Sequence, residues 1–214
     1  MHNKVKLEPI HLLYDERMLL HRPVGWVEPE VYPGYLDDID DDYPMENPER
    51  LRVIFERLCN LDKRLLHRGN FPDLVHHGTV FKRLSCEMAT KDQIMLAHSE
   101  EFFERLEDLK YLDDNNLANI TYKRRHDIYY GHDSFNAARL AAGGLVACVD
   151  AVCTPNAGTK KALALVRPPG HHACQEQEMG FCFINSVVVA AKYALATEQA
   201  KRIVILDWDV HDGK

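Results

Sequence analysis

Two stretches decide the fold: ALALVRPPGHH, residues 162–172, and IVILDWDVH, residues 203–211. Each opens with an apolar run that lacks polar alternation, which is typical of strands that helices cover on both faces. A helix is expected between them, from about Asn185 to Thr197. Strand, loop, helix and strand in this order is the pattern of a parallel sheet, so the sequence predicts an α/β fold.

Further elements are expected from strand and capping signals elsewhere in the chain. Residues 9–14 are expected to form a first strand. Helices are expected where a side chain that can cap a helix precedes a periodic segment. These capping residues are Asn47, Thr90, Ser99 and Ser134. The helix after Asn47 has an expected apolar stripe of Leu51, Ile54, Phe55 and Leu58. Gly143-Gly144, inside the last of these helices, predicts close packing against a neighbour.

Composition limits the classes of partner. The chain has 214 residues, a net charge of −7 and a pI near 5.9, so it lacks the overall basic footprint expected of a nucleic-acid-binding protein. No run approaches the roughly 18–20 continuous apolar residues that cross a bilayer. The six cysteines have no metal-finger spacing and indicate a reducing, intracellular setting. We expect one domain, residues 1–214, with an acidic loop insertion at 28–46.

Asp207, Asp209 and His211 follow the second apolar run at positions i, i+2 and i+4. In an extended segment such side chains point to one side. They are expected at the carboxyl end of a parallel strand, where open sheets bind ligands. Two carboxylates and an imidazole suit a divalent metal such as zinc. A solvated polar loop explains the same three residues about equally well.

His171 and His172 favour the metal interpretation. They follow the neighbouring predicted strand after a stiff Pro-Pro-Gly turn. Parallel strands lie only ~4.8 Å apart, or ~10 Å with one strand between, so the loops can place imidazoles beside a metal. A lone histidine is more often structural, but a pair in this position is a candidate general acid/base. Gly180 and Phe181 follow; they either line a ligand slot or pack in the core.

Three segments together resemble the class II histone deacetylases, in order and in spacing. They are residues 165–173, 180–186 and 205–213. Weaker similarity covers Tyr14-Asp15, residues 47–50, His98-Ser99 and the expected helix from Ser134. The resemblance implies the arginase/deacetylase fold, in which a parallel sheet lies between two layers of helices (three layers, α/β/α).

The resemblance also implies roles for individual residues. Asp209 and His211 match two of three zinc ligands. His171 and His172 match the pair that activates water and protonates the leaving amine, and Asp207 matches the carboxylate that supports the first histidine. A potassium site is implied near Asp207, Asp209 and His211. Gly180 and Phe181 match part of the acetyl-lysine tunnel.

The implied activity is hydrolysis of the acetyl amide of acetyl-lysine in histones or other proteins, with a role in chromatin and transcription. The implied partners are a corepressor or an oligomer partner, without direct contact to nucleic acid or membrane, in the nucleus, the cytoplasm or both. The family's third zinc ligand and oxyanion tyrosine have no match here, and the family pattern changes at His211-Asp212-Gly213-Lys214. We therefore expect a domain truncated at its C-terminal side, and inactive and poorly soluble, or dependent on a partner, when isolated.

Two further interpretations stay open. One is a pseudoenzyme that binds partners or acetylated peptides without turnover. The other is a relative of the acetylpolyamine amidohydrolases, which shares these motifs and differs in tunnel shape.

Overall fold

The computed structural model describes residues 8–27, 44–67, 81–124, 127–155 and 159–214. Most of the expected acidic insertion, residues 28–43, lies outside this part of the chain. The described residues form a three-stranded parallel sheet in the order β2-β1-β3. The strands are β1 (Ile10–Leu13), β2 (Phe81–Leu84) and β3 (Ala162–Ala164). The apolar runs at 9–14 and 162–166 therefore form neighbouring strands, as expected, but β3 is not covered on both faces as predicted, because Ala162 and Leu163 are exposed.

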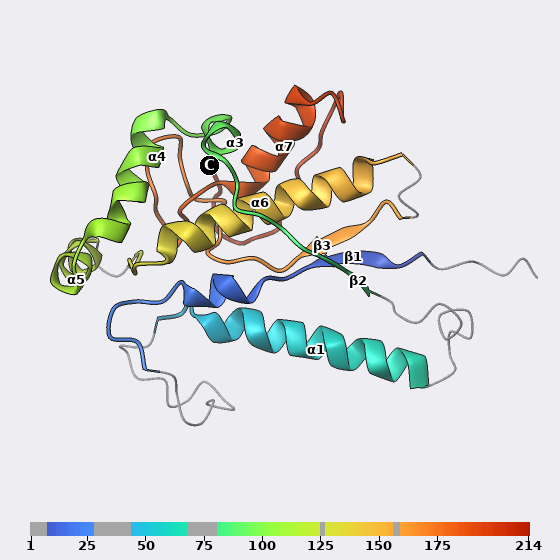
Figure 1. Ribbon diagram of the computed structural model, residues 1–214, viewed down its shortest axis with the longest axis horizontal. Helices are drawn as coiled ribbons and strands as arrows, with labels where there is room; N and C mark the ends of the chain where they lie inside the picture. Colours follow the sequence, from blue (N-terminus) through green and yellow to red (C-terminus); the bar gives the residue numbers. More distant parts are fainter. Residues whose placement is uncertain (1–7, 28–43, 68–80, 125–126, 156–158) are drawn as a thin grey trace, which may run out of the picture.

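Helices lie on both sides of this sheet. Figure 1 shows α1 (Pro48–His67) on one side, with α6 (Ser134–Cys153) and α7 (Ser186–Ala196) on the other. The remaining helices are α3 (Lys91–Met95), α4 (Glu100–Glu107), α5 (Asp114–Lys123) and the 3-10 turns η1 (Glu16–Leu20) and η3 (Asp108–Tyr111). The order helix, sheet, helix confirms the predicted α/β/α architecture.

Three of the four expected caps form. Asn47 accepts a hydrogen bond from the backbone N–H of Glu49 at 3.0 Å, and Ser99 accepts one from Phe102 at 3.2 Å. Thr90 and Gln93 form a complete capping box. The expected cap at Ser134 is wrong, because its buried hydroxyl accepts from Gly131 N–H and contacts the ring of His21, each at 2.8 Å.

The sequence signals missed or misplaced several other features. Strand β2 and helix α5 were not expected. In α1, Leu51 is buried and Phe55 stacks on Tyr14, but Ile54 is 47% exposed. The apolar stripe of α1 is thus narrower than predicted.

Helix α6 is the central helix of the core. It is long and apolar enough to cross a bilayer, but half of its most apolar stretch is buried inside the fold, where it packs against α7 and β3. A Cβ on Gly143 would lie 2.0 Å from the carbonyl oxygen of Glu87, and one on Gly144 would lie 2.1 Å from Leu13. The predicted close packing at the two glycines is confirmed.

Residues 203–206 do not form the predicted buried strand. They pair with no strand in the described part of the chain. Val204 is 93% exposed and Leu206 is 79% exposed. A parallel strand needs a neighbouring strand to accept and donate its backbone hydrogen bonds. β3 pairs only with β1 in the described chain and does not pair with residues 203–206. An open apolar groove of about 480 Å³ separates this segment from β3, α6 and α7.

Candidate functional site

The loop that carries His171 and His172 is packed tightly against the start of α7. A Cβ on Gly170 would lie 2.6 Å from the carbonyl oxygen of Ile184 and 2.9 Å from the amide nitrogen of Ser186. Only glycine allows this approach. Both histidines are half-buried, and their ring centroids lie 4.0 Å apart. The tandem histidines therefore occupy one fixed position at the carboxyl end of β3.

His171 pairs with Asp207, 36 residues further along the chain. The Nδ1 atom of His171 lies 3.0 Å from Oδ2 of Asp207. Two interactions hold the pKa of Asp207 below its ordinary value: the backbone N–H of Asp209 first, and then the ring of His171. Because an ionised carboxylate only accepts hydrogen bonds, Nδ1 carries the proton and Nε2 is the basic nitrogen. This is the arrangement of a histidine oriented to accept a proton.

Asp209 and His211 contact each other. Oδ1 of Asp209 accepts from the backbone N–H of His211 and lies 2.8 Å from its Nδ1. The backbone N–H of His211, and then its ring, lower the pKa of Asp209. The ring centroids of His211 and His172 lie 5.9 Å apart. The structure thus gathers all five sequence-predicted polar residues at one place.

These residues fit a zinc ion only in part. Carboxylate oxygen and imidazole nitrogen are suitable zinc ligands, and Oδ1 of Asp209 and Nδ1 of His211 lie 2.8 Å apart. A catalytic zinc usually has three protein ligands. Within the described ranges, no group of three or more His, Cys, Asp or Glu side chains is arranged to hold a metal. Asp209 and His211 therefore offer two candidate metal-binding side chains, one fewer than a catalytic zinc site usually has.

Gly180 and Phe181 form a tight turn beside the histidines. Both have positive φ angles, 55° and 64°. A Cβ on Gly180 would lie 2.4 Å from Cδ2 of His172, so glycine is required there. The turn is held by Asp127, whose carboxylate and carbonyl oxygens accept from the amides of Gly180 and Phe181, both at 2.9 Å. Sequence reasoning missed Asp127, because nothing near it in the chain indicates these partners.

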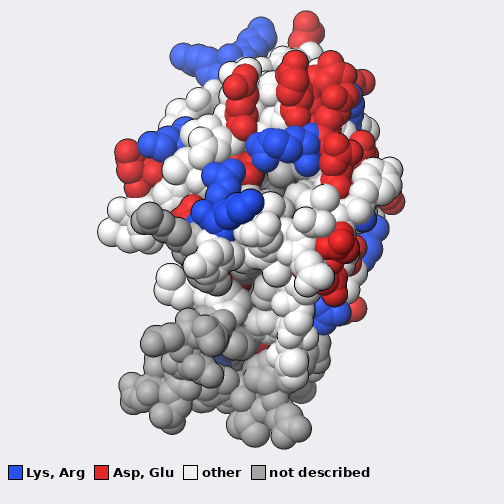
Figure 2. All heavy atoms as spheres, turned by 90° about the vertical axis from the view of Figure 1, so that its left-hand side faces the viewer, with Lys and Arg blue, Asp and Glu red and all other residues white. Residues whose placement is uncertain are grey.

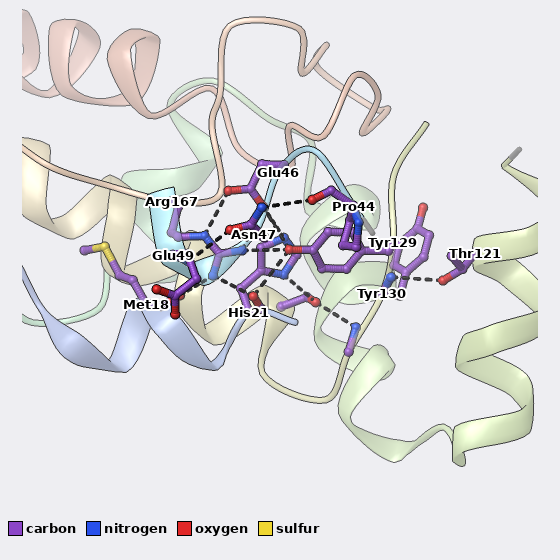
Figure 3. A network of polar contacts seen from close by, with 12 residues as sticks. Met18, His21, Pro44, Glu46, Asn47, Glu49, Thr121, Tyr129, Tyr130 and Arg167 are labelled. Atoms are coloured by element: carbon purple, nitrogen blue, oxygen red, sulfur yellow. Dashed lines mark hydrogen bonds and ion pairs between the residues drawn. The ribbon is translucent and has the colours of Figure 1, made fainter. Parts of the chain in front are cut away.

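A buried network of hydrogen bonds around Arg167 holds the chain just before the histidine loop (Figure 3). All five N–H donors of Arg167 have acceptors. Glu46 accepts two of these bonds, at 2.9 and 2.8 Å. The carbonyls of Met18 and His21 and the hydroxyl of Tyr129 accept the others. Arg167 thus joins four segments of the chain immediately before the Pro-Pro-Gly turn.

His21 completes this network as a neutral residue. Burial, and then the Arg167 guanidinium, hold the pKa of His21 well below its ordinary value. A neutral ring that accepts from Ser134 at Nδ1 carries its proton on Nε2, which lies 3.4 Å from Glu46. Sequence reasoning missed His21, Glu46 and Tyr129. The one available signal was Arg167 itself, since a charged residue at the end of an apolar run, if buried, needs a buried partner.

A second buried carboxylate lies before the Gly180 turn. Glu178 accepts hydrogen bonds from Arg105, Arg124 and the hydroxyl of Tyr130. Figure 2 shows the side of the molecule that carries α4 and α5, where basic and acidic side chains lie next to one another. Lys91 also bridges Glu100 and Glu104 there. Both signs of charge occur on this face, so its described residues form no uniform basic surface.

The sequence and the fold of this chain are similar to those of known proteins. A family model described as "Histone deacetylase domain" matches residues 44–214. "Histone deacetylase 6" from Caenorhabditis elegans is 37% identical over 82% of this chain and 17% of its own length. "Polyamine deacetylase HDAC10" from Mus musculus is 41% identical over 82% of this chain and 24% of its own length.

Among solved structures, the HDA15 HD domain matches with a TM-score of 0.69 and 30% identity, over 96% of this chain and 48% of that chain. The chain thus spans about half of this solved structure, and 17% and 24% of the two curated relatives.

Proposed function

Because this chain belongs to the histone deacetylase family, with the features of class II, we propose that its residues serve the zinc-assisted hydrolysis of an N-acetyl amide. The observation that carries the proposal is the hydrogen bond between His171 and Asp207, made beside His172 and within reach of the Asp209–His211 pair. Family membership supports an amidohydrolase site here, and the geometry supports a division of roles among its residues.

His171 is the residue that takes a proton from water. Its Nδ1–H is held by Asp207, which leaves Nε2 free to accept, and the carboxylate stabilises the imidazolium that forms. His172, 4.0 Å away between ring centroids, is placed to return a proton to the leaving amine. Zinc, when held by Asp209, His211 and a further ligand, supplies a Lewis acid for the acetyl carbonyl and lowers the pKa of water towards ~7.

We further propose acetyl-lysine of histones or other proteins as substrate, which would place the protein in chromatin and transcription control, in the nucleus, the cytoplasm or both. A corepressor or oligomer partner belongs to the same proposal, as does a potassium ion near Asp207, Asp209 and His211. Gly180 and Phe181 would line the slot for the acetyl-lysine side chain.

An acetylated polyamine is the second candidate substrate, because relatives named polyamine deacetylases match this chain. Comparing an acetyl-lysine peptide with an acetylated polyamine in the same assay separates the two. Preference for the polyamine would exclude acetyl-lysine proteins as the main substrate.

A non-catalytic, peptide-binding role is the third candidate, and the two-ligand metal site favours it for the isolated 214-residue chain. The test is to purify this chain, titrate it with Zn²⁺, and measure both binding and hydrolysis of an acetyl-lysine peptide. We expect zinc-dependent binding, with hydrolysis at least ~10²–10³ slower than in a site with a complete set of oxyanion donors.

Substitutions test whether the measured hydrolysis depends on His171. His171→Asn should remove residual hydrolysis and leave zinc binding unchanged. His132→Asn is the matched control, because His132 makes a similar contact with Asp114, at 2.8 Å. If the wild-type chain binds neither zinc nor the peptide, the proposed function is wrong for these residues. Tight stoichiometric zinc with rapid turnover would support the function and contradict the incomplete site.

A further inference from the structure

One short segment contacts both loops of the candidate site. Residues 127–130 precede α6. Asp127 contacts the turn at Gly180 and Phe181, and Tyr129 reaches the opposite loop through Arg167. The two loops approach each other where Gly180 meets the ring of His172. Residues 127–130 therefore connect the loop of His171 and His172 with the Gly180–Phe181 turn, which would line the slot for the substrate.

The turn at Gly180 depends on external hydrogen bonds. Phe181 has a φ of 64°, a conformation that is unfavourable for a residue with a Cβ. Met179 and Cys182 close the turn through two backbone hydrogen bonds, at 3.1 and 2.9 Å. The amides of Gly180 and Phe181 point outward from the turn, and Asp127 accepts from both of them. One residue thus satisfies both left-handed positions.

Asp127 is itself held in place from both directions along the chain. Its backbone N–H donates to the carbonyl of Arg124 at 3.0 Å. Two residues later, Tyr129 is buried and its hydroxyl donates to Glu46 at 2.9 Å. The carboxylate of Asp127 is thus presented to Gly180 from a fixed backbone.

We propose that Asp127 is a positioning residue, which holds the Gly180–Phe181 turn against His172 and so sets the width of the substrate slot. This role rests on the proposed function. Asp127 makes no hydrogen bond to His171 or Asp207 in the described chain, so we expect its substitution to act on substrate binding and to leave the His171–Asp207 hydrogen bond intact.

Two substitutions separate the parts of this interaction. Asp127→Ala removes the side-chain acceptor for Gly180 but keeps the backbone acceptor for Phe181. Asp127→Asn keeps a side-chain acceptor and removes only the charge. Asp113→Ala is the matched control, because Asp113 likewise accepts one backbone N–H, from Asn116 at 2.8 Å, but at the start of α5.

The experiment combines amide hydrogen exchange with an acetyl-lysine peptide titration of the zinc-loaded chain, both followed by NMR. In Asp127→Ala we expect faster exchange at Gly180 than at Phe181. We also expect peptide affinity to fall about 3- to 10-fold, the worth of one hydrogen bond. Asp127→Asn should restore affinity to within about twofold of wild type, and Asp113→Ala should leave it unchanged. Where hydrolysis is measurable, KM should rise while kcat stays constant.

Two results would overturn the proposal: peptide affinity unchanged in Asp127→Ala despite faster exchange at Gly180, or an equal loss in Asp113→Ala. A wild-type chain that binds no peptide contradicts the proposed function instead. In that case the amide exchange rate at Gly180 alone tests whether Asp127 holds the turn. A rate in Asp127→Ala equal to that of the wild type would refute this role of Asp127.

Discussion

The loop that carries His171 and His172 and the segment that carries Asp209 and His211 differ in how the fold holds them. Behind the loop, Arg167 and Glu46 form a fully buried ion pair with every guanidinium donor satisfied. The metal-ligand segment is exposed: the side chain of Asp209 is 47% exposed and that of His211 is 71% exposed. The core thus holds the proposed acid/base half of the site in place, whereas the proposed metal half is held by short-range contacts.

The largest expected effect tests the anchored half. Arg167→Met leaves Glu46 as a buried carboxylate without its partner, so we expect the free energy of unfolding to fall by about 3–5 kcal/mol. Urea denaturation measures it. Arg17→Met is the control, since the Arg17–Asp15 pair is half exposed on the arginine side, and its loss should cost less than about 1 kcal/mol. Equal losses in the two variants would show that the Arg167 network is no anchor.

A second test concerns helix α6, which lies on the side of the sheet opposite α1. Gly143→Ala would place a methyl group 2.0 Å from the carbonyl oxygen of Glu87, so we expect destabilisation by about 1–3 kcal/mol. Helix propensity alone predicts the opposite sign, a gain of roughly 0.8–1 kcal/mol. A thermal melt that shows stabilisation would mean that α6 does not pack as tightly as described.

Local features of the fold could be predicted from the sequence better than the long-range contacts that hold the site. Capping residues placed α1, α3 and α4, and Gly143-Gly144 indicated close packing, because these signals are local. The run at 203–206 has the same apolar pattern as a buried strand, yet hydrophobicity alone does not say whether neighbouring strands are present. The network of Glu46, His21, Tyr129 and Arg167 could not be predicted, because its members are up to 146 residues apart.

The exposed half gives the third prediction. Leu206→Lys should change the free energy of unfolding by less than about 0.5 kcal/mol, because the side chain is already 79% exposed. The same change should reduce self-association measured by sedimentation velocity, because it interrupts an exposed apolar run. Leu12→Lys, at a buried position of β1, is the contrasting variant and should prevent folding. Destabilisation by Leu206→Lys would mean that residues 203–206 are covered.

The smallest effect concerns Asp207 in the metal-free protein. Its lowered pKa predicts a carboxyl titration midpoint below 3.8, with the hydrogen bond to His171 lost as the pH falls through that midpoint. A carboxyl group whose pKa is lowered on folding stabilises the fold at pH values above its pKa in the unfolded chain. This contribution is lost as the pH falls through the pKa of the folded state. In His171→Asn the midpoint should rise only partway, since the backbone N–H of Asp209 is the larger cause. Carbon-detected NMR measures both midpoints, and a full return to 3.8 would assign the whole shift to His171.

The proposal that Asp209 and His211 bind the metal is tested most directly with Co²⁺, a spectroscopic substitute for zinc. The wild-type chain, Asp209→Asn and His211→Asn are each titrated with this ion. We expect one weak site in the wild type that either substitution abolishes, with the His171–Asp207 pair unchanged in both variants. A tight stoichiometric site that survives both substitutions would contradict the assignment of Asp209 and His211 as the metal ligands of this deacetylase-family chain.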